Sequence, residues 1–268
     1  MARIAIIGLV GRSMFFEVPR FHSGGETITA RGYYEEWGGK GFNQAVAAAR
    51  QDAAVSFLGA VNAADAKALK DFCQQEGVAV TVAVKKKPTA CAAILTDGTG
   101  ETRVTVYPGA ELEPRDVDGF AGSIAMADFL LLNNEVPEAV NLAAVAIARE
   151  YGVKVILNPA PARALPDELK KSVFLFTPNE FEEESLELKA EVITTLGAKG
   201  CRIGSTGEVI PAPAAKPVDS TGAGDTFNAV LAVRLAEGET LHDACVAANE
   251  AAARSVAVKY VMPSLPRR

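Results

Sequence analysis

The stretch DSTGAGDTFNAV, Asp219–Val230, places small residues and one carboxylate where a helix is predicted to begin. Gly222, Ala223 and Gly224 let the backbone approach an anion, and the unpaired amides at a helix start carry about half a positive charge. Asp225 comes next and can accept the proton of an attacking hydroxyl group while the amides stabilise negative charge. The stretch therefore predicts phosphoryl transfer. Taken alone, it is equally consistent with a capped helix after a Gly-rich turn.

Short runs of Ile, Val and Leu alternate with helical patterns along the rest of the chain. The predicted strands are Ile4–Val10, Val55–Leu58, Phe129–Leu132, Val153–Leu157, Val173–Phe176 and Val192–Thr195. The predicted helices are Asn43–Gln51, Ala64–Glu76, Pro137–Tyr151, Ala223–Ala236 and Leu241–Val258. This alternation is typical of a mostly parallel sheet covered by helices, so the sequence predicts the α/β fold class.

Two segments, at about residues 24–37 and 78–106, show strand patterns with no helix between the strands. Such segments predict a small accessory sheet, which we expect to cover the site as a β lid. The chain has neither an internal repeat nor a low-complexity linker. We therefore expect a single domain over residues 1–268, with these two segments contributing its lid.

The composition disfavours several classes of protein. A net charge of −6 provides no basic face for nucleic acid. No apolar run has the length of a membrane span, and the first run, IAIIGLV, is too short for a secretory signal, so we expect a cytoplasmic protein with no membrane partner. The two histidines, His22 and His242, and four cysteines without CxxC spacing disfavour a zinc site and a Ser-His-Asp hydrolase. The cysteines are expected to be buried, reduced thiols.

A second glycine cluster, WGGKGFNQAVAAA at Trp37–Ala49, also leads into an Ala-rich helical pattern. Lys40 and Asn43 lie within it. Glycines at this point allow the close approach of a polar ligand, but a tight turn between a strand and a helix explains them equally well. The cluster alone leaves both interpretations open.

Together the two clusters make the chain resemble the ribokinase-like carbohydrate kinases, the PfkB family. GGKGFNQAVAAA is similar to the family's N-terminal signature and DSTGAGDTFNAV to its C-terminal signature. Between them NPAPA at Asn158–Ala162, TPNEFE at Thr177–Glu182 and TLGAKG at Thr195–Gly200 follow in the expected order. NPAPARALPDEL and GGKGFNQAVAAAR are most similar to the ribokinase members. The resemblance spans nearly the whole chain and implies a ribokinase-like three-layer fold with a mostly parallel central sheet and a small β lid.

The resemblance implies that Asp225 is the base acting on a sugar hydroxyl, beside an anion hole formed by Gly222, Ala223 and Gly224. Sugar-binding positions of the family correspond to Gly39, Lys40, Asn43 and Glu135, with Ser13 expected to contact a further group of the substrate. A homodimer formed through the lid is also implied.

On the nucleotide side, family positions correspond to Asn179, Thr195, Gly197, Gly200 and Asn249. The resemblance implies ATP as donor and Mg²⁺ as cofactor, with Glu182 holding Mg²⁺ through water in an NxxE motif. A site for a monovalent cation such as K⁺ is implied at Asp219, Thr221 and Ser264. The residues alone leave alternatives open: an exposed acidic helix start for the NxxE motif, and a solvent-facing helix position for Asn249.

The chain departs from the family pattern in three places. Where ribokinases show an Asn and an Asp that bind sugar hydroxyls, this sequence has Gly11 and Ser13, which weakens ribose binding or favours another polyol. Tyr260 stands where the family commonly has a glycine, which casts doubt on the cation site. The segment 183–192 is short, because the family normally fits another helix there, so this chain has either a truncation or missing residues.

The leading hypothesis is an ATP-dependent phosphotransferase acting on a primary hydroxyl of a small sugar, with ribose as the first candidate. A nucleoside or other sugar kinase of the same family is the alternative within this class. A ligand-binding relative without catalysis is the alternative outside it. A dinucleotide oxidoreductase is less well supported, because GLVG lacks the GxGxxG spacing.

Overall fold

The computed structural model describes residues 1–184, 186 and 190–268. Its centre is a nine-stranded sheet, parallel from β5 to β11 and antiparallel at β12 and β13. In spatial order the strands are β13 (Val209–Ile210), β12 (Cys201–Ile203), β11 (Glu191–Thr195), β10 (Leu175–Phe176), β9 (Lys154–Asn158), β8 (Phe129–Asn133), β1 (Arg3–Ile7), β4 (Ala54–Asn62) and β5 (Val78–Lys85). The predicted mostly parallel sheet is confirmed.

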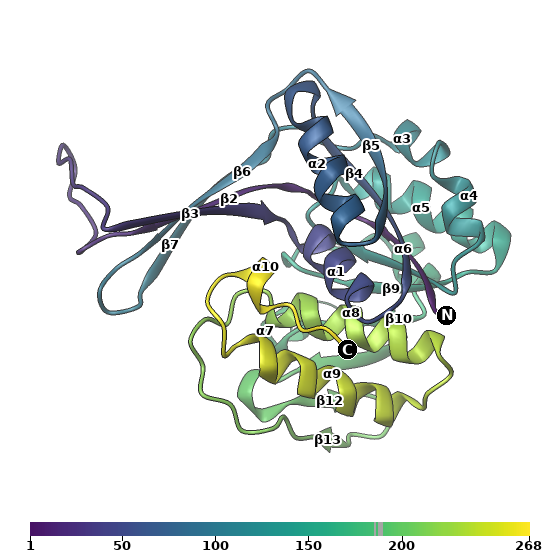
Figure 1. Cartoon of the computed structure of the whole chain (residues 1–268). Coiled ribbons are helices and arrows are strands. Elements are labelled where there is room, and N and C mark those ends of the chain that lie inside the picture. Colours follow the sequence, from purple (N-terminus) through teal and green to yellow (C-terminus); the bar gives the residue numbers. More distant parts are fainter. Residues whose placement is uncertain (185, 187–189) are drawn as a thin grey trace.

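Helices cover both faces of this sheet and complete three layers (Figure 1). One face carries α1 (Lys40–Ala49), α2 (Ala63–Gln75), α8 (Ala223–Ala236) and α9 (Leu241–Ser255). The other carries α3 (Pro114–Asp118), α4 (Ala121–Ala125), α5 (Glu138–Tyr151) and α6 (Asp167–Ser172). The short elements are α7 (Glu180–Glu184), the 3-10 turn η1 (Gly197–Lys199) and α10 (Val261–Ser264).

The two hydrophobic cores follow the alternation of side chains along the strands. In β1, Ile4 and Ile6 face the core under α1 and α8, whereas Ala5 and Ile7 face the core under α5. Strands buried on both faces read as continuous apolar runs, which is why the sequence pattern located them. Three of the four cysteines, Cys73, Cys201 and Cys245, are buried; Cys91 is half-buried, and all four are free thiols.

A second sheet of four strands projects from the body as an arm (Figure 1). Its spatial order is β3 (Gly32–Gly38), β2 (Gly11–Glu17), β6 (Ala90–Thr96) and β7 (Thr102–Tyr107). We call it the small sheet. It is inserted in two pieces, one between β1 and α1 and the other between β5 and α3.

The predicted membership of the small sheet, about 24–37 and 78–106, is wrong in two places. Val78–Lys85 is β5, which pairs with β4 at the edge of the large sheet. Its alternating pattern arises because Val78, Val80 and Val82 pack into the core on the α2 side, whereas the opposite face carries smaller or polar side chains. Gly11–Glu17 is β2 and belongs to the small sheet, although it follows β1 after only three residues. The predicted strand Ile4–Val10 therefore ends at Ile7.

The start of α1 lies directly on the carboxyl ends of two central strands. A Cβ atom added to Gly41 would lie 2.6 Å from the Cα atom of Gly8, which follows β1, and 3.0 Å from Nδ2 of Asn133, which ends β8. From β1 the chain builds β4 and β5 on one side and β8 to β11 on the other. Ligands of open α/β sheets bind outside the carboxyl ends at such a reversal, so this contact positions the glycine cluster at the expected place.

Replacing Gly41 with Ala tests this contact. Because an added methyl group would overlap Gly8, we expect the free energy of unfolding to fall by about 1–3 kcal/mol. Gly122 in α4 is the matched control, since a Cβ atom there meets nothing within 4 Å. Urea unfolding should show Gly122→Ala to be neutral or stabilised by up to about 1 kcal/mol. Equal effects of the two substitutions would contradict the close contact.

Candidate active site

Helix α8 begins within the stretch DSTGAGDTFNAV, Asp219–Val230. Gly222 is its N-cap residue, with φ of 80°, and no side chain caps the helix. Thr226 and Asn228 donate their side-chain hydrogen bonds to the carbonyls of Gly222 (3.0 Å) and Gly224 (2.9 Å). Among the described residues no acceptor binds the amides of Gly222 and Gly224, whereas Ala223 donates to the Ser220 carbonyl at 3.3 Å. The helix start thus presents free N–H groups that suit an anion.

Asp225 lies at the end of this array and is only 6% exposed. Its Oδ2 accepts a hydrogen bond from Nδ2 of Asn43 at 2.8 Å, and its Oδ1 accepts one from Nε2 of Gln44 at 3.3 Å. Burial raises the pKa of Asp225, while the Lys40 charge and the two amide donors oppose this rise. The carboxylate is therefore a stronger base than a free aspartate, as general-base catalysis requires.

Sequence reasoning missed Gln44. It is fully buried in α1, next to Asn43, and both side chains reach α8 although about 180 residues separate them from Asp225. The available signal was two consecutive amide side chains in an otherwise apolar, Ala-rich helix. Buried polar side chains need partners, so such a pair indicates a polar contact with another element.

Lys40 and Glu135 lie on the side of Asp225 where α1 begins. The backbone N–H of Lys40 donates to Oε2 of Glu135 at 2.7 Å. Burial raises the pKa of Glu135 to about 7, against the opposing effect of Lys40. Burial also acts to lower the pKa of Lys40, but the negative charges of Asp225, Glu135 and Glu182 outweigh it, and the pKa is raised. The ammonium group is thus held in its charged form beside the carboxylates.

A cavity of about 200 Å³ lies beside Lys40, Asp225 and the start of α8. It is lined by Lys40, Asn158, Ala160, Thr177, Asn179, Glu182, Thr195, Ser220, Gly222, Gly224, Asp225 and Asn228. A general base, a cation and the open start of a helix therefore face one space. That combination can deprotonate a hydroxyl group and stabilise a phosphoryl group in transfer.

Asn179 and Glu182 form a reciprocal cap at the start of α7. The N–H of Asn179 donates to Oε2 of Glu182 at 2.9 Å, and the N–H of Glu182 donates to Oδ1 of Asn179 at 2.8 Å. This capping box explains the NxxE spacing, and it holds Glu182 in the wall of the cavity. Within the described part of the chain, no three His, Cys, Asp or Glu side chains are arranged to hold a metal ion.

A second cavity, of about 390 Å³, adjoins the first and shares Thr195, Ser220 and Gly224 with it. Gly197, Gly200 and Asn249 line it together with alanines and prolines of the segment 212–217. Asn249 is buried, not solvent-facing, and its Nδ2 donates to the Ile210 carbonyl at 2.9 Å. Small apolar side chains around a slot next to an anion site are suited to a planar base.

The remaining predicted site residues lie outside these two cavities. Asp219 accepts the N–H groups of Thr221 (2.9 Å) and Tyr260 (3.0 Å), and the Ser264 hydroxyl donates to the Val261 carbonyl (2.8 Å). Ser13 lies in β2, beside Gly38 of β3. The structure therefore brings Asp219 and Thr221 together and leaves the hydroxyl of Ser264 bound to its own helix.

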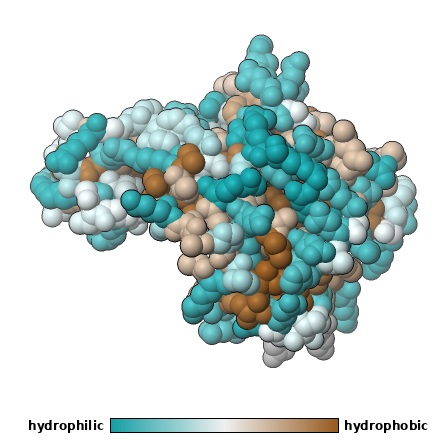
Figure 2. Space-filling view, turned by 60° about the horizontal axis from the view of Figure 1, so that its bottom comes forward, coloured by the Kyte–Doolittle hydropathy of each residue, from teal (hydrophilic) through white to brown (hydrophobic). Residues whose placement is uncertain are grey.

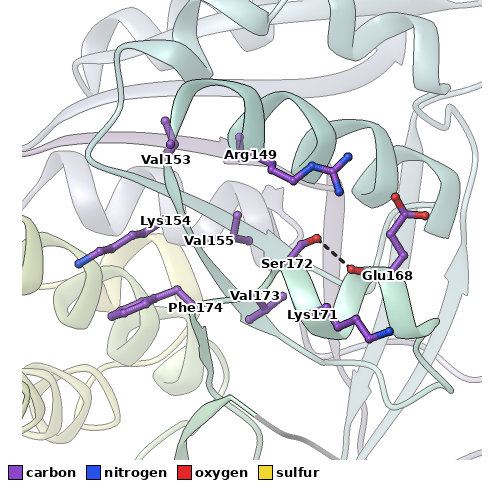
Figure 3. A pocket seen from close by; sticks show the side chains of 11 residues that line it. Arg149, Val153, Lys154, Val155, Glu168, Lys171, Ser172, Val173 and Phe174 are labelled. Carbon is purple, nitrogen blue, oxygen red and sulfur yellow. Dashed lines mark hydrogen bonds between the residues drawn. The ribbon is translucent and has the colours of Figure 1, made fainter.

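A larger cavity, of about 720 Å³, lies at the amino end of β9, whereas Asn158 at its carboxyl end lines the candidate site (Figure 3). Arg149 lies in the last turn of α5 and Lys171 in the last turn of α6, where cations offset the helix dipoles. The ammonium of Lys154 lies 4.6 Å from the centre of the Phe174 ring. The positive charges of Arg149, Lys154 and Lys171 in this cavity thus have structural explanations and do not indicate a second active site.

A model of the pfkB family of carbohydrate kinases matches residues 1–268. The chain belongs to this family. The ribokinase of Haemophilus influenzae is 36% identical over 293 aligned positions, which cover 99% of this chain and 95% of the relative. The ribokinase of Bacillus subtilis is 33% identical, with 100% and 97% covered.

Solved structures extend the likeness of this pfkB carbohydrate kinase to the fold. Ribokinase from Thermotoga maritima is similar with a TM-score of 0.90 at 30% identity, covering 100% of this chain and 97% of that one. Ribokinase from Arabidopsis thaliana, solved with ribose and ATP, is similar with a TM-score of 0.88 at 28% identity, covering 100% and 96%. The predicted ribokinase-like fold is confirmed, and the oxidoreductase alternative is excluded.

The structure tests two predictions only in part, the one on membrane association and the one on the segment 183–192. No described helix is long and apolar enough to cross a membrane. The short segment predicted at 183–192 includes residues 185 and 187–189, which lie outside the described part of the chain.

Replacing Glu135 with Gln tests the half-buried carboxylate of this residue. Because the pKa of Glu135 rises from its ordinary 4.5 to about 7, folding favours its protonated form, and stability present below pH 4.5 is lost as the pH rises through 7. The loss reaches roughly 3 kcal/mol at 1.36 kcal/mol per pKa unit. Urea unfolding at about pH 5 to 8 should show Glu135→Gln increasingly stabilised relative to the native chain. The exposed Glu138→Gln should show no such trend; a flat difference for Glu135→Gln would contradict the assignment.

Proposed function

We propose that the chain transfers the γ-phosphoryl group of ATP to a primary hydroxyl of a small sugar, with ribose as the first candidate. The observation that carries this proposal is the position of Asp225, which faces the same cavity as the open start of α8. The ribose and ATP bound in the Arabidopsis relative support the choice of substrates. Carbohydrate kinase chemistry itself follows from family membership.

In the proposed mechanism, Asp225 accepts the proton of the sugar hydroxyl as that oxygen attacks the γ-phosphorus of ATP, and the bond from this phosphorus to the bridging oxygen breaks, so that ADP leaves. The N–H groups of Gly222 and Gly224 stabilise the negative charge on the phosphoryl oxygens during transfer. Asn43 and Gln44 fix the direction of the Asp225 carboxylate, and the charge of Lys40 opposes the rise in its pKa that burial causes. Most of the acceleration then comes from positioning and from charge stabilisation, since the protein forms no covalent bond.

Mg²⁺ fits the donor groups present. Glu182 presents its carboxylate in the wall of the cavity of about 200 Å³, which we call the transfer cavity, and would hold the ion through water, with Asn179 beside it. Mg²⁺ keeps several waters and binds phosphates, so it does not require three protein carboxylates. When bound, it would neutralise charge on the phosphates. K⁺ at Asp219, Thr221 and Ser264 stays a prediction of the family resemblance.

The small sheet explains one departure from the family pattern. A Cβ atom at Gly11 would lie 2.5 Å from the Ala90 carbonyl oxygen, so β2 and β6 leave no room for a longer side chain there. Ser13 is then the polar side chain that this part of β2 can offer to a sugar. A neutral hydroxyl binds sugar hydroxyls less strongly than a carboxylate, which keeps nucleosides and other sugars as alternative substrates.

An ADP-release assay tests the function directly. Wild-type protein with ATP is assayed against pentoses, hexoses and nucleosides, with and without Mg²⁺ and K⁺. We expect Mg²⁺-dependent turnover with ribose ranking first among the acceptors. A nucleoside ranking first would favour the alternative within the family. Nucleotide binding with no ADP from any acceptor would instead indicate a catalytically silent relative.

Replacing Asp225 with Asn tests the base. The substitution preserves the size of the side chain but removes the charge that accepts a proton, so we expect kcat to fall by about two to four orders of magnitude, the scale for a general base. Asp71→Asn, on the exposed surface of α2, serves as the control and should retain full turnover. Near-normal turnover of Asp225→Asn, with unchanged thermal unfolding, would refute the assignment.

We propose in addition that two chains associate through the small sheet. Val104 and Val106 of the edge strand β7 are 57% and 60% exposed, and every residue of β7 is open to solvent. Figure 2 shows hydrophobic side chains among hydrophilic ones on the projecting arm. An exposed edge strand with apolar side chains is suited to pairing with another chain.

Glutamates at positions 104 and 106 test this association. In sedimentation velocity we expect the native chain to form dimers and the double substitution Val104→Glu, Val106→Glu to shift it to monomers, because buried charges oppose association. Val84→Glu, on the exposed face of β5, should leave the dimer unchanged. At tens of micromolar, roughly the concentration at which a weak dimer would be detected, a native chain that is only monomeric would contradict the proposal.

A further inference from the structure

Tyr260 has a backbone conformation that is rare for a residue with a side chain. Its φ is 67°, and apart from Asp52 it is the only residue other than glycine with a positive φ in the described chain. It directly precedes α10, which lies beneath the base of the small sheet (Figure 1). Such a conformation persists only where surrounding contacts hold it, and it often marks a functional position.

The ring of Tyr260 is held by the small sheet. It stacks on Tyr34 of β3, with ring centroids 4.1 Å apart and planes at 21°, and meets Phe15 of β2 edge-on at 5.0 Å. Its hydroxyl lies 3.3 Å from Oε1 of Glu17, which also pairs with Lys259. These contacts hold the side chain of Tyr260 against β2 and β3.

The backbone after Tyr260 is held by the same sheet. Glu36 of β3 is only 6% exposed, and its two carboxylate oxygens accept the N–H groups of Val261 and Met262, each at 2.9 Å. These N–H groups open α10. A buried carboxylate with two such bonds is costly to separate from its donors, so β3 and the start of α10 move as one unit.

Tyr260 and Val261 also contact the segment 219–222, which ends at the anion-hole residue Gly222. The N–H of Tyr260 donates to Oδ2 of Asp219, whose Oδ1 accepts the N–H of Thr221, the residue before Gly222. Val261 packs against Gly222 itself, since a Cβ atom there would lie 2.6 Å from Cγ1 of Val261. One short segment therefore lies between the small sheet and the residue that opens α8.

We propose that Tyr260 and Val261 couple the small sheet to the anion hole, so that sugar bound under the sheet improves the binding of the nucleotide phosphates. The assignment of the two ligands rests on the function proposed above; the mechanical link does not. A shift of β3 is carried by Glu36 and Tyr34 to the segment 260–262, and from there to Gly222. Tyr260 is a positioning residue, since it lines neither cavity.

Hydrogen exchange of the ligand-free protein tests the link without any substrate. Tyr34→Ala removes the ring that stacks on Tyr260, and we expect amides 219–226 to exchange at least about fivefold faster. Tyr33→Ala is the matched control, because Tyr33 directly precedes Tyr34 in β3 and its side chain is 57% exposed. It should leave exchange at 219–226 unchanged. Unchanged exchange in Tyr34→Ala, or equal acceleration in both variants, would overturn the proposal.

The affinity of a non-hydrolysable ATP analogue, measured with and without ribose, tests the coupling. We expect ribose to tighten analogue binding by about fivefold or more in the native chain, and the ratio to approach one in Tyr260→Gly. Tyr260→Phe keeps the ring and should keep the ratio. A purely structural role would weaken both affinities and leave the ratio intact, which would overturn the proposal.

The two proposals fail in distinguishable ways. A native chain that releases no ADP with any acceptor refutes the proposed function, and the exchange experiment then still decides the link. A native chain that turns over while Tyr260→Gly retains both the coupling ratio and slow exchange at 219–226 refutes the link alone. If Tyr260→Gly unfolds, Tyr34→Ala is measured in the same ribose titration.

Discussion

The structure depends on one buried carboxylate, that of Asp225. A charge removed from water must be matched by donors or by opposite charge, and here the match comes from Asn43, Gln44 and Lys40, all on α1. Helix α1 must therefore lie against the start of α8. The close contact of Gly41 with Gly8 brings α1 onto the sheet at the right point, so the packing of two helices and the satisfaction of one charge are the same requirement.

The two glycine clusters lead into their helices in the same way. Gly39 (φ 106°) and Gly222 (φ 80°) each precede a helix, and neither helix has a side-chain cap. A positive φ lets the chain turn sharply into the helix, and the missing cap leaves N–H groups unpaired. At α1 one of these groups, that of Lys40, binds Glu135, whereas at α8 they face the transfer cavity. The starts of both helices thus contribute residues to the lining of one cavity.

Much of the fold and of the candidate site was predictable from the sequence. Strands buried on both faces give continuous apolar runs, and the helix Ala223–Ala236, an Ala-rich stretch without breakers, was predicted with the bounds observed. The exchange of β5 for β2 was not predictable, because an edge strand of the large sheet alternates just as a strand of the small sheet does. Motifs placed Asp225 and Glu182 at the cavity. The contacts of Gln44 with Asp225 and of Tyr260 with Tyr34 join distant parts of the chain, and no local pattern carries them.

The balance of charge around Asp225 explains why its partners are two amides and one ammonium. Burial raises the pKa of the carboxylate and so makes it a better proton acceptor, but a carboxylate that is already protonated accepts nothing. Two ammonium partners would hold the pKa low and leave a weak base. Two neutral amides direct the oxygens without adding charge, and the single charge of Lys40 is shared with Glu135 and Glu182. The donors therefore oppose, without cancelling, the rise in the Asp225 pKa that burial causes, and the resulting basic carboxylate can accept the proton of a hydroxyl group.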